Sequence, residues 1–216
     1  MKVEFVDKTI NITAKRGSGK SVLTKYFLTS IGKLFHKIFC ICPTEQINRF
    51  YSDILDPDCI FETYNEDWVE KLIKTLTKLN SGKKGLEQKK ILLVLDDCCS
   101  DTCFHTSNSL KKLYTRGRHL GLSVIMISQH LTHIPPVARN NADYVIVSQL
   151  NRASLGLLAD EYCSANISKE EFHQLYSNAT KDFHFFVINQ NATKSGDVDE
   201  IYGCIGAPPE FVKRIL

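Results

Sequence analysis

The chain has 216 residues, of which 43% are hydrophobic and 24% are charged, and its formal net charge is +3 at pH 7. This length suffices for a full hydrophobic core, and we expect a single domain over residues 1–216. The small basic excess allows a polyanionic partner without requiring one. No apolar run is long enough for a membrane span, and residues 1–8 mix charges with hydrophobic residues, so we expect an intracellular protein that is not secreted.

Eight cysteines in a chain of this length are too sparse for a disulfide scaffold, and we expect reduced thiols. Cys98 and Cys99 are adjacent, and Cys99, Cys103 and His105 have half of the spacing that a zinc site requires. No second Cys/His pair of comparable spacing follows. We therefore expect these cysteines to be incidental and not to be metal ligands.

Six short apolar runs have the length of β-strands, and helical patterns separate them. The runs are Thr9–Thr13, Lys37–Cys42, Ile91–Leu95, Ser123–Ser128, Tyr144–Ser148 and His184–Asn189. The runs ILLVL and VIMIS are apolar on both faces, which is typical of a parallel sheet. This alternation predicts an α/β fold, with a mostly parallel central sheet flanked by helices on both faces. Ligands of such sheets bind at the carboxyl ends of the strands.

Three segments carry helical signals. Apolar residues repeat at helical spacing over Val22–Phe35 and again over Val69–Leu79. Ser168 and Glu171 have the spacing of a capping box ahead of a third helix. The Gly- and Lys-rich segment 80–90 interrupts the pattern, and we expect it to be a solvated loop.

The segment AKRGSGKS, residues 14–21, follows the first predicted strand and precedes the first predicted helix. It matches the P-loop pattern G-x-x-x-x-G-K-[ST], except that Ala14 replaces the first glycine. Gly17 and Gly19 would let backbone N–H groups converge on phosphate oxygens at the helix N-terminus. Lys20 would reach the β- and γ-phosphates of ATP, and the Ser21 hydroxyl would ligate Mg²⁺. The expected nucleotide-binding residues are Lys15, Arg16, Gly17, Ser18, Gly19, Lys20, Ser21 and Val22.

Polar side chains follow two further predicted strands. ILLVL ends in Asp96 and Asp97, and VIMIS ends in Ser128 and Gln129. At the carboxyl edge of a parallel sheet, Asp96 can hold Mg²⁺ through water, and Asp97 can act as the general base that orients the nucleophile. Gln129 can donate to the γ-phosphate and accept from the attacking water. Together with Lys20, these residues predict nucleotide hydrolysis.

The segment LKKLYTRGRHLG places a basic cluster around a helix end. Arg116 or Arg118 could act in trans as an arginine finger on the γ-phosphate of a neighbouring subunit. The cluster, which includes Lys111 and Lys112, could instead contact DNA phosphates, or it could be a solvated helix C-terminus whose cations favour the helix dipole.

Four segments, AKRGSGKS, VLDDC, TRGRHLGLSVIMISQH and NADYVIV, together resemble the FtsK/HerA superfamily over about residues 9–150. Within it, they are most similar to the genome-packaging ATPases of poxviruses, other large double-stranded DNA viruses and virophages. The resemblance implies a RecA-like P-loop core of the ASCE class. It also implies an extra strand between the P-loop strand and the acidic strand, which Lys37–Cys42 would supply.

The resemblance further implies a ring, hexameric or pentameric, that couples ATP hydrolysis to the movement of double-stranded DNA into a preformed capsid. A capsid or vertex protein would be a partner, and the protein would act in the host cytoplasm or viral factory and transiently at the capsid vertex. Residues 151–216 match no motif of the family. Its functional residues fall on Lys20, on the pair Asp96 and Asp97, on Gln129, and on Arg116 or Arg118 as the finger.

Three other functions share the P-loop. A cellular DNA translocase or helicase of the same superfamily would usually carry appended domains, for which we expect no room in 216 residues. A nucleoside or nucleotide kinase would need an acceptor pocket. A scaffold that binds ATP without turnover would not need Asp97. We therefore expect an ATPase.

Overall fold

The computed structural model describes residues 2–100, 102–192, 197–209 and 211. Its strands are β1 (Thr9–Ala14), β2 (Lys37–Ile41), β3 (Ile60–Phe61), β4 (Ile91–Asp96), β5 (Leu122–Ser128), β6 (Tyr144–Ser148), β7 (Phe185–Asn189) and β8 (Tyr202–Ile205). Its α-helices are α1 (Lys20–Ile31), α2 (Glu45–Asn48), α3 (Glu66–Leu79), α4 (Thr102–Thr106), α5 (Asn108–Arg116), α6 (Pro136–Asn140), α7 (Arg152–Tyr162), α8 (Lys169–Ala179) and α9 (Val198–Ile201).

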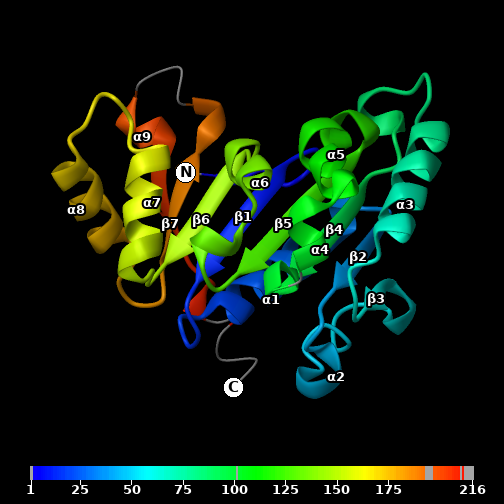
Figure 1. Ribbon diagram of the computed structural model, residues 1–216, viewed down its shortest axis with the longest axis horizontal. Coiled ribbons are helices and arrows are strands. Elements are labelled where there is room, and N and C mark those ends of the chain that lie inside the picture. Colours follow the sequence, from blue (N-terminus) through cyan, green and yellow to red (C-terminus); the bar gives the residue numbers. More distant parts are fainter. Residues whose placement is uncertain (1, 101, 193–196, 210, 212–216) are drawn as a thin grey trace.

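All of these strands belong to one sheet, in the order β3-β2-β4-β5-β1-β6-β7-β8 (Figure 1). The strands from β3 to β6 in this order are parallel, and β7 and β8 add antiparallel pairings at one side. The mostly parallel sheet predicted from the sequence is therefore confirmed. The carboxyl ends of its parallel strands lie toward the lower edge of Figure 1.

The position of the extra strand was predicted wrongly. The strand between the P-loop strand β1 and the acidic strand β4 is β5, whereas β2 lies on the outer side of β4. The residues Lys37–Ile41 therefore do not supply the inserted strand, although they come between β1 and β4 along the chain. The reason is physical: the β1–α1–β2 crossover carries the chain past two strand positions, which β5 and β4 later fill.

Side chains of the central strands alternate between two cores, because successive residues of a strand point to opposite faces. In β4, Leu92 and Val94 pack with α1, while Leu93 and Leu95 pack with α3, α5, α7 and α8. Each of these leucine and valine side chains is completely buried. Helices on both faces are thus confirmed, with α1 on one face and the larger set on the other (Figure 1).

The local predictions differ from the structure mainly at the ends of elements. The helix expected over Val22–Phe35 ends at Ile31, and Leu34 in the following short turn is 54% exposed. The predicted capping box of Ser168 and Glu171 is present. Most of segment 80–90 is exposed, as expected, but its last residue, Lys90, is buried and pairs with Asp7. Among the helices of the described residues, none is long and apolar enough to cross a membrane.

Candidate active site

The P-loop lies between β1 and α1 and is shaped by two glycines. Gly17 has φ 80° and Gly19 has φ 85°, which is the left-handed conformation that favours glycine. The Ser18 hydroxyl donates to the carbonyl of Lys15 at 2.7 Å and closes the loop on itself. Ala14 is the last residue of β1, buried and paired with Ser148 of β6, so this position accepts alanine without strain.

The first turn of α1 has the properties of an anion site. No side chain caps its N-terminus, and no acidic residue lies in its first turn. Its free N–H groups and the positive end of the helix dipole therefore favour a bound anion. Lys20 and Ser21 begin the helix, and Ser21 is exposed. A Cβ placed on Gly17 would meet nothing within 4 Å, so the loop has open space beside it for a polyphosphate.

Asp96 ends β4 and lies near Lys20, although the two residues are far apart in the sequence. Burial raises the pKa of the Asp96 carboxyl to about 6. A hydrogen bond from the Tyr51 hydroxyl, 2.7 Å from Asp96 Oδ2, opposes this increase in pKa. The charge of Asp97 raises the pKa further, and the Lys20 ammonium lowers it. A cation placed here would relieve the repulsion between the two carboxylates.

Asp97 and Gln129 are in direct contact at the carboxyl ends of neighbouring strands. The Gln129 amide Nε2 donates to Asp97 Oδ2 at 3.1 Å. Asp97 has φ 53°, a left-handed conformation that aspartate tolerates better than most residues. Its backbone N–H still bonds to the carbonyl of Ile127 in β5 at 3.0 Å. The chain therefore turns sharply at Asp97, while its backbone stays joined to the sheet.

Tyr51 was missed by the sequence reasoning. Its ring is buried, and it belongs to the segment between α2 and β3. Glu45 holds this segment, because its carboxylate accepts bonds from the backbone N–H groups of Tyr51 and Ser52 and from the Ser52 hydroxyl. No sequence motif marks Tyr51, and only the fold brings it to Asp96.

The cysteines after β4 point into the protein interior. The Cys98 thiol lies 3.4 Å from the carbonyl of Ile41, and burial raises the pKa of the Cys99 thiol to about 12. Both are therefore neutral thiols near pH 7. His105 bonds to the carbonyl of Cys99 at 2.9 Å, while the side chain of Cys103 lies outside the described residues. Among the residues that are described, no cluster could hold a metal ion in the manner of a zinc site.

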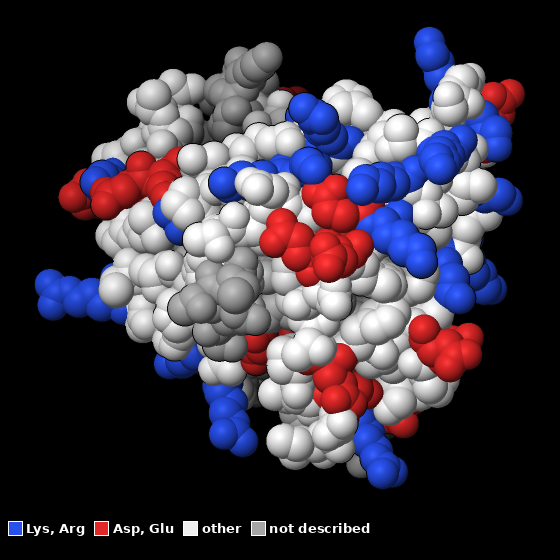
Figure 2. All heavy atoms as spheres, turned by 45° about the vertical axis from the view of Figure 1, so that its right-hand side comes forward, with Lys and Arg blue, Asp and Glu red and all other residues white. Residues whose placement is uncertain are grey.

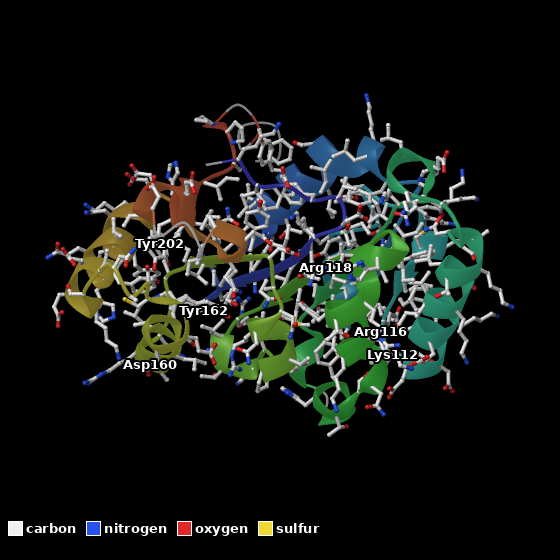
Figure 3. All side chains as sticks on the ribbon, turned by 90° about the horizontal axis from the view of Figure 1, so that it is seen from above. Lys112, Arg116, Arg118, Asp160, Tyr162 and Tyr202 are labelled. Atoms are coloured by element: carbon white, nitrogen blue, oxygen red, sulfur yellow. The ribbon has the colours of Figure 1, made fainter. Side chains whose placement is uncertain are left out.

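The predicted arginine fingers lie at the opposite edge of the sheet. Arg116 ends α5 and Arg118 lies in the short helix Gly117–Leu120, immediately before β5 begins at Leu122. The seven residues of β5 separate them from Gln129, and a strand of that length spans about 20 Å. Figure 3 looks onto this edge and shows Arg116 beside Lys112, with Arg118 nearer the centre of the molecule; both arginines are exposed. In one subunit, therefore, the structure does not bring the arginines to the P-loop.

The sequence from residue 4 to residue 189 matches the family described as Poxvirus A32 protein. The chain belongs to the poxvirus A32 protein family. An uncharacterized protein, 075L, of Invertebrate iridescent virus 6 is 31% identical over 189 residues, which are 87% of this chain and 72% of that protein. DNA packaging protein OPG160 of vaccinia virus is 26% identical over 135 residues, which are 60% of this chain and 48% of that protein.

The fold of this A32-family chain is also found in solved structures. The genome packaging NTPase B204 of Sulfolobus turreted icosahedral virus 2, solved with ATP-γS, has a TM-score of 0.64 at 19% identity, covering 94% of this chain and 98% of that chain. The pCW3 conjugation coupling protein TcpA, also with ATP-γS, has a TM-score of 0.62 at 16% identity, covering 97% of this chain and 65% of that chain. These findings confirm the predicted resemblance to packaging ATPases of the FtsK/HerA type, and the RecA-like P-loop fold.

Proposed function

We propose that this chain hydrolyses ATP with Mg²⁺, and that a ring of such subunits moves double-stranded DNA into a preformed capsid. The contact between Asp97 and Gln129, at the edge of the sheet where the P-loop begins, carries the proposal. A carboxylate and an amide in contact at this edge could together hold a water molecule beside a bound γ-phosphate. The similarity to OPG160 of vaccinia virus, a DNA packaging protein, supports the biological role.

Each residue of the site would have a distinct task. Bound Mg-ATP would supply the phosphoanhydride bond and the positive charge of the metal. The backbone of residues 15–19 and the Lys20 ammonium would hold the phosphates, while Ser21 and Asp96 would hold the metal. Asp97 would take the proton of the attacking water, and Gln129 would keep Asp97 and the water in position.

The arginines would complete the site from a neighbouring subunit. Arg116 and Arg118 are exposed on the edge opposite the P-loop, so they could reach a γ-phosphate only in trans. The same edge is rich in basic side chains. The upper right of Figure 2 shows Lys and Arg side chains gathered there. These cations offer contacts to DNA phosphates as the second role of the cluster. A capsid or vertex protein at the site of virus assembly would be the further partner.

The test is phosphate release from Mg-ATP, with and without double-stranded DNA. Asp97→Asn should lower the rate at least 100-fold, which is the usual size of a general-base contribution. Asp58→Asn, at an exposed aspartate in the short helix Pro57–Cys59, is the matched control and should leave the rate unchanged. We expect DNA to raise the wild-type rate.

Three results would count against the proposal. Equal rates for the wild type and Asp97→Asn would remove Asp97 from the reaction. Transfer of phosphate to an added nucleoside or nucleotide, in preference to water, would instead indicate a kinase. Nucleotide binding without turnover, even in the presence of DNA and at high protein concentration, would indicate a scaffold.

A further inference from the structure

An exposed phenylalanine occupies a strained turn beside the P-loop. Lys181–His184 form a tight turn between α8 and β7, in which the His184 N–H bonds to the carbonyl of Lys181 at 2.9 Å. Both central residues are left-handed, Asp182 with φ 51° and Phe183 with φ 59°. Such turns strongly favour Asn-Gly, because a bulky side chain is strained in this conformation.

The turn is held firmly at the edge of the sheet where the P-loop lies. Because β7 runs antiparallel to β6, it begins where the parallel strands end (Figure 1). The Ser148 hydroxyl, at the end of β6, donates to the carbonyl of His184 at 2.8 Å. On the other side, a Cβ placed on Gly206 would lie 2.9 Å from the His184 ring, so this ring packs directly on the backbone. The strained conformation is therefore imposed by its surroundings.

The Phe183 ring lies beside Gly19 of the P-loop but is not part of the core. A Cβ placed on Gly19 would lie 3.5 Å from Phe183 Cδ1 and 3.6 Å from its Cβ. The residue nevertheless remains 65% exposed. An exposed aromatic ring gains little stability from burial, and glycine would suit this backbone better. Folding alone thus gives no reason for phenylalanine at this position, whereas a ligand at the P-loop would.

We propose that Phe183 stacks on the base of the nucleotide whose phosphates the P-loop holds. This inference rests on the proposed function. Gly19 immediately precedes α1, at whose N-terminus phosphates would bind, and the ribose and base of a nucleotide must extend from there into the space beside the loop. An aromatic face next to Gly19 can pair with the π-face of any base. The expected ligands are therefore nucleoside triphosphates, with only modest preference for one base.

The test compares ATP with inorganic tripolyphosphate, which has the phosphates but no base. Affinities of both are measured by calorimetry for the wild type, Phe183→Ala and Phe183→Trp. Phe183→Ala should weaken ATP about 5- to 100-fold, the range of one base–aromatic stack, and leave tripolyphosphate unchanged. Phe183→Trp should bind ATP as the wild type does. The control is Leu86→Ala, which removes a fully exposed side chain that is distant from Phe183 in the sequence.

A stability measurement separates stacking from a structural role. Phe183→Gly relieves the left-handed strain, so its melting temperature should equal or exceed that of the wild type, while its ATP affinity falls as in Phe183→Ala. Equal weakening of ATP and tripolyphosphate would overturn the inference, because Phe183 would then only support the loop. Unchanged affinity for both would also overturn it and would leave the proposed ATPase intact. A wild type that binds neither would refute the proposed function itself.

Discussion

The surroundings of the Asp96 carboxyl destabilise its ionised form. Burial and Asp97 raise its pKa, and the Tyr51 hydroxyl and Lys20 compensate only in part, so that the pKa is about 6. The unfavourable charge is useful in a site for Mg²⁺, because the cation supplies the compensating positive charge that the protein itself does not. In the absence of metal and nucleotide, the same charge should reduce the stability of the fold.

The Asp96→Asn variant tests whether the Asp96 charge lowers the free energy of unfolding when EDTA has removed metal ions. Between the ordinary pKa of 3.8 and the folded value of about 6, the folded protein binds more protons than the unfolded chain. The free energy of unfolding should therefore fall as pH rises through this window. At pH 8, Asp96→Asn should be more stable than the wild type by about 1 to 3 kcal/mol. At pH 4 this difference should largely vanish in urea unfolding curves, and a difference independent of pH would contradict the assignment.

The residues that could be predicted from the sequence are those whose chemistry depends on local spacing. Lys20 and Ser21 follow from the P-loop pattern, and Asp96 follows from its place at the end of an apolar run. Tyr51 could not be found in this way, since it lies 45 residues from the carboxylate it contacts. No sequence pattern marks Phe183, because only the antiparallel course of β7 brings it to Gly19.

At the scale of elements, one buried carboxylate organises the segment that carries Tyr51. Glu45 is only 7% exposed and accepts bonds from two backbone N–H groups and one hydroxyl. Glu45→Ala would leave these donors without their acceptor and should lower the free energy of unfolding by about 2 to 4 kcal/mol. The measurement is urea unfolding at pH 7, with Glu87→Ala, on an exposed short turn, as the control.

The conservative variant Glu45→Gln refines this prediction. Its amide oxygen can still accept bonds, although without the charge, so the loss should be about half as large. A loss below about 0.5 kcal/mol for Glu45→Ala, the usual range for surface substitutions, would show that the segment does not depend on this carboxylate.

The strands that were predicted correctly are those with apolar runs or alternations of at least five residues. The two that were missed are β3, which has only two residues, and β8, which contains a glycine. Local patterns also could not predict the direction of β7 or the position of β2 in the sheet. Strand order and direction depend on how the connections between strands place them beside one another. Composition and periodicity therefore predicted the sheet but not its complete order.

For the whole molecule, the decisive feature is that the proposed catalytic groups lie at opposite edges of one sheet. The P-loop, Asp97 and Gln129 occupy one edge, and Arg116 and Arg118 occupy the other. A head-to-tail contact between subunits brings unlike surfaces together and closes into a ring when the rotation allows. Such a contact would put the arginines of one subunit at the P-loop of the next, so each subunit alone should be almost inactive.

Mixing two inactive variants tests this arrangement. Lys20→Ala removes the nucleotide site. The double variant Arg116→Ala/Arg118→Ala removes the fingers and should lower the rate about 1,000-fold or more. In a random ring of equal parts, an intact site meets an intact finger at roughly a quarter of the interfaces, so the mixture should recover about that share of the wild-type rate. The recovered rate is measured as phosphate release at a fixed total protein concentration.

The control is a mixture of Lys20→Ala with Asp97→Asn. Both changes damage the same site, so no interface in the mixed ring is complete, and the mixture should stay inactive. If the arginine variant is fully active without DNA, the two arginines are not fingers, and a lower DNA affinity would then assign them to phosphate contacts. If both mixtures are equally inactive while the rings still assemble, the groups at the two edges do not form a shared site, and the in-trans assignment is wrong.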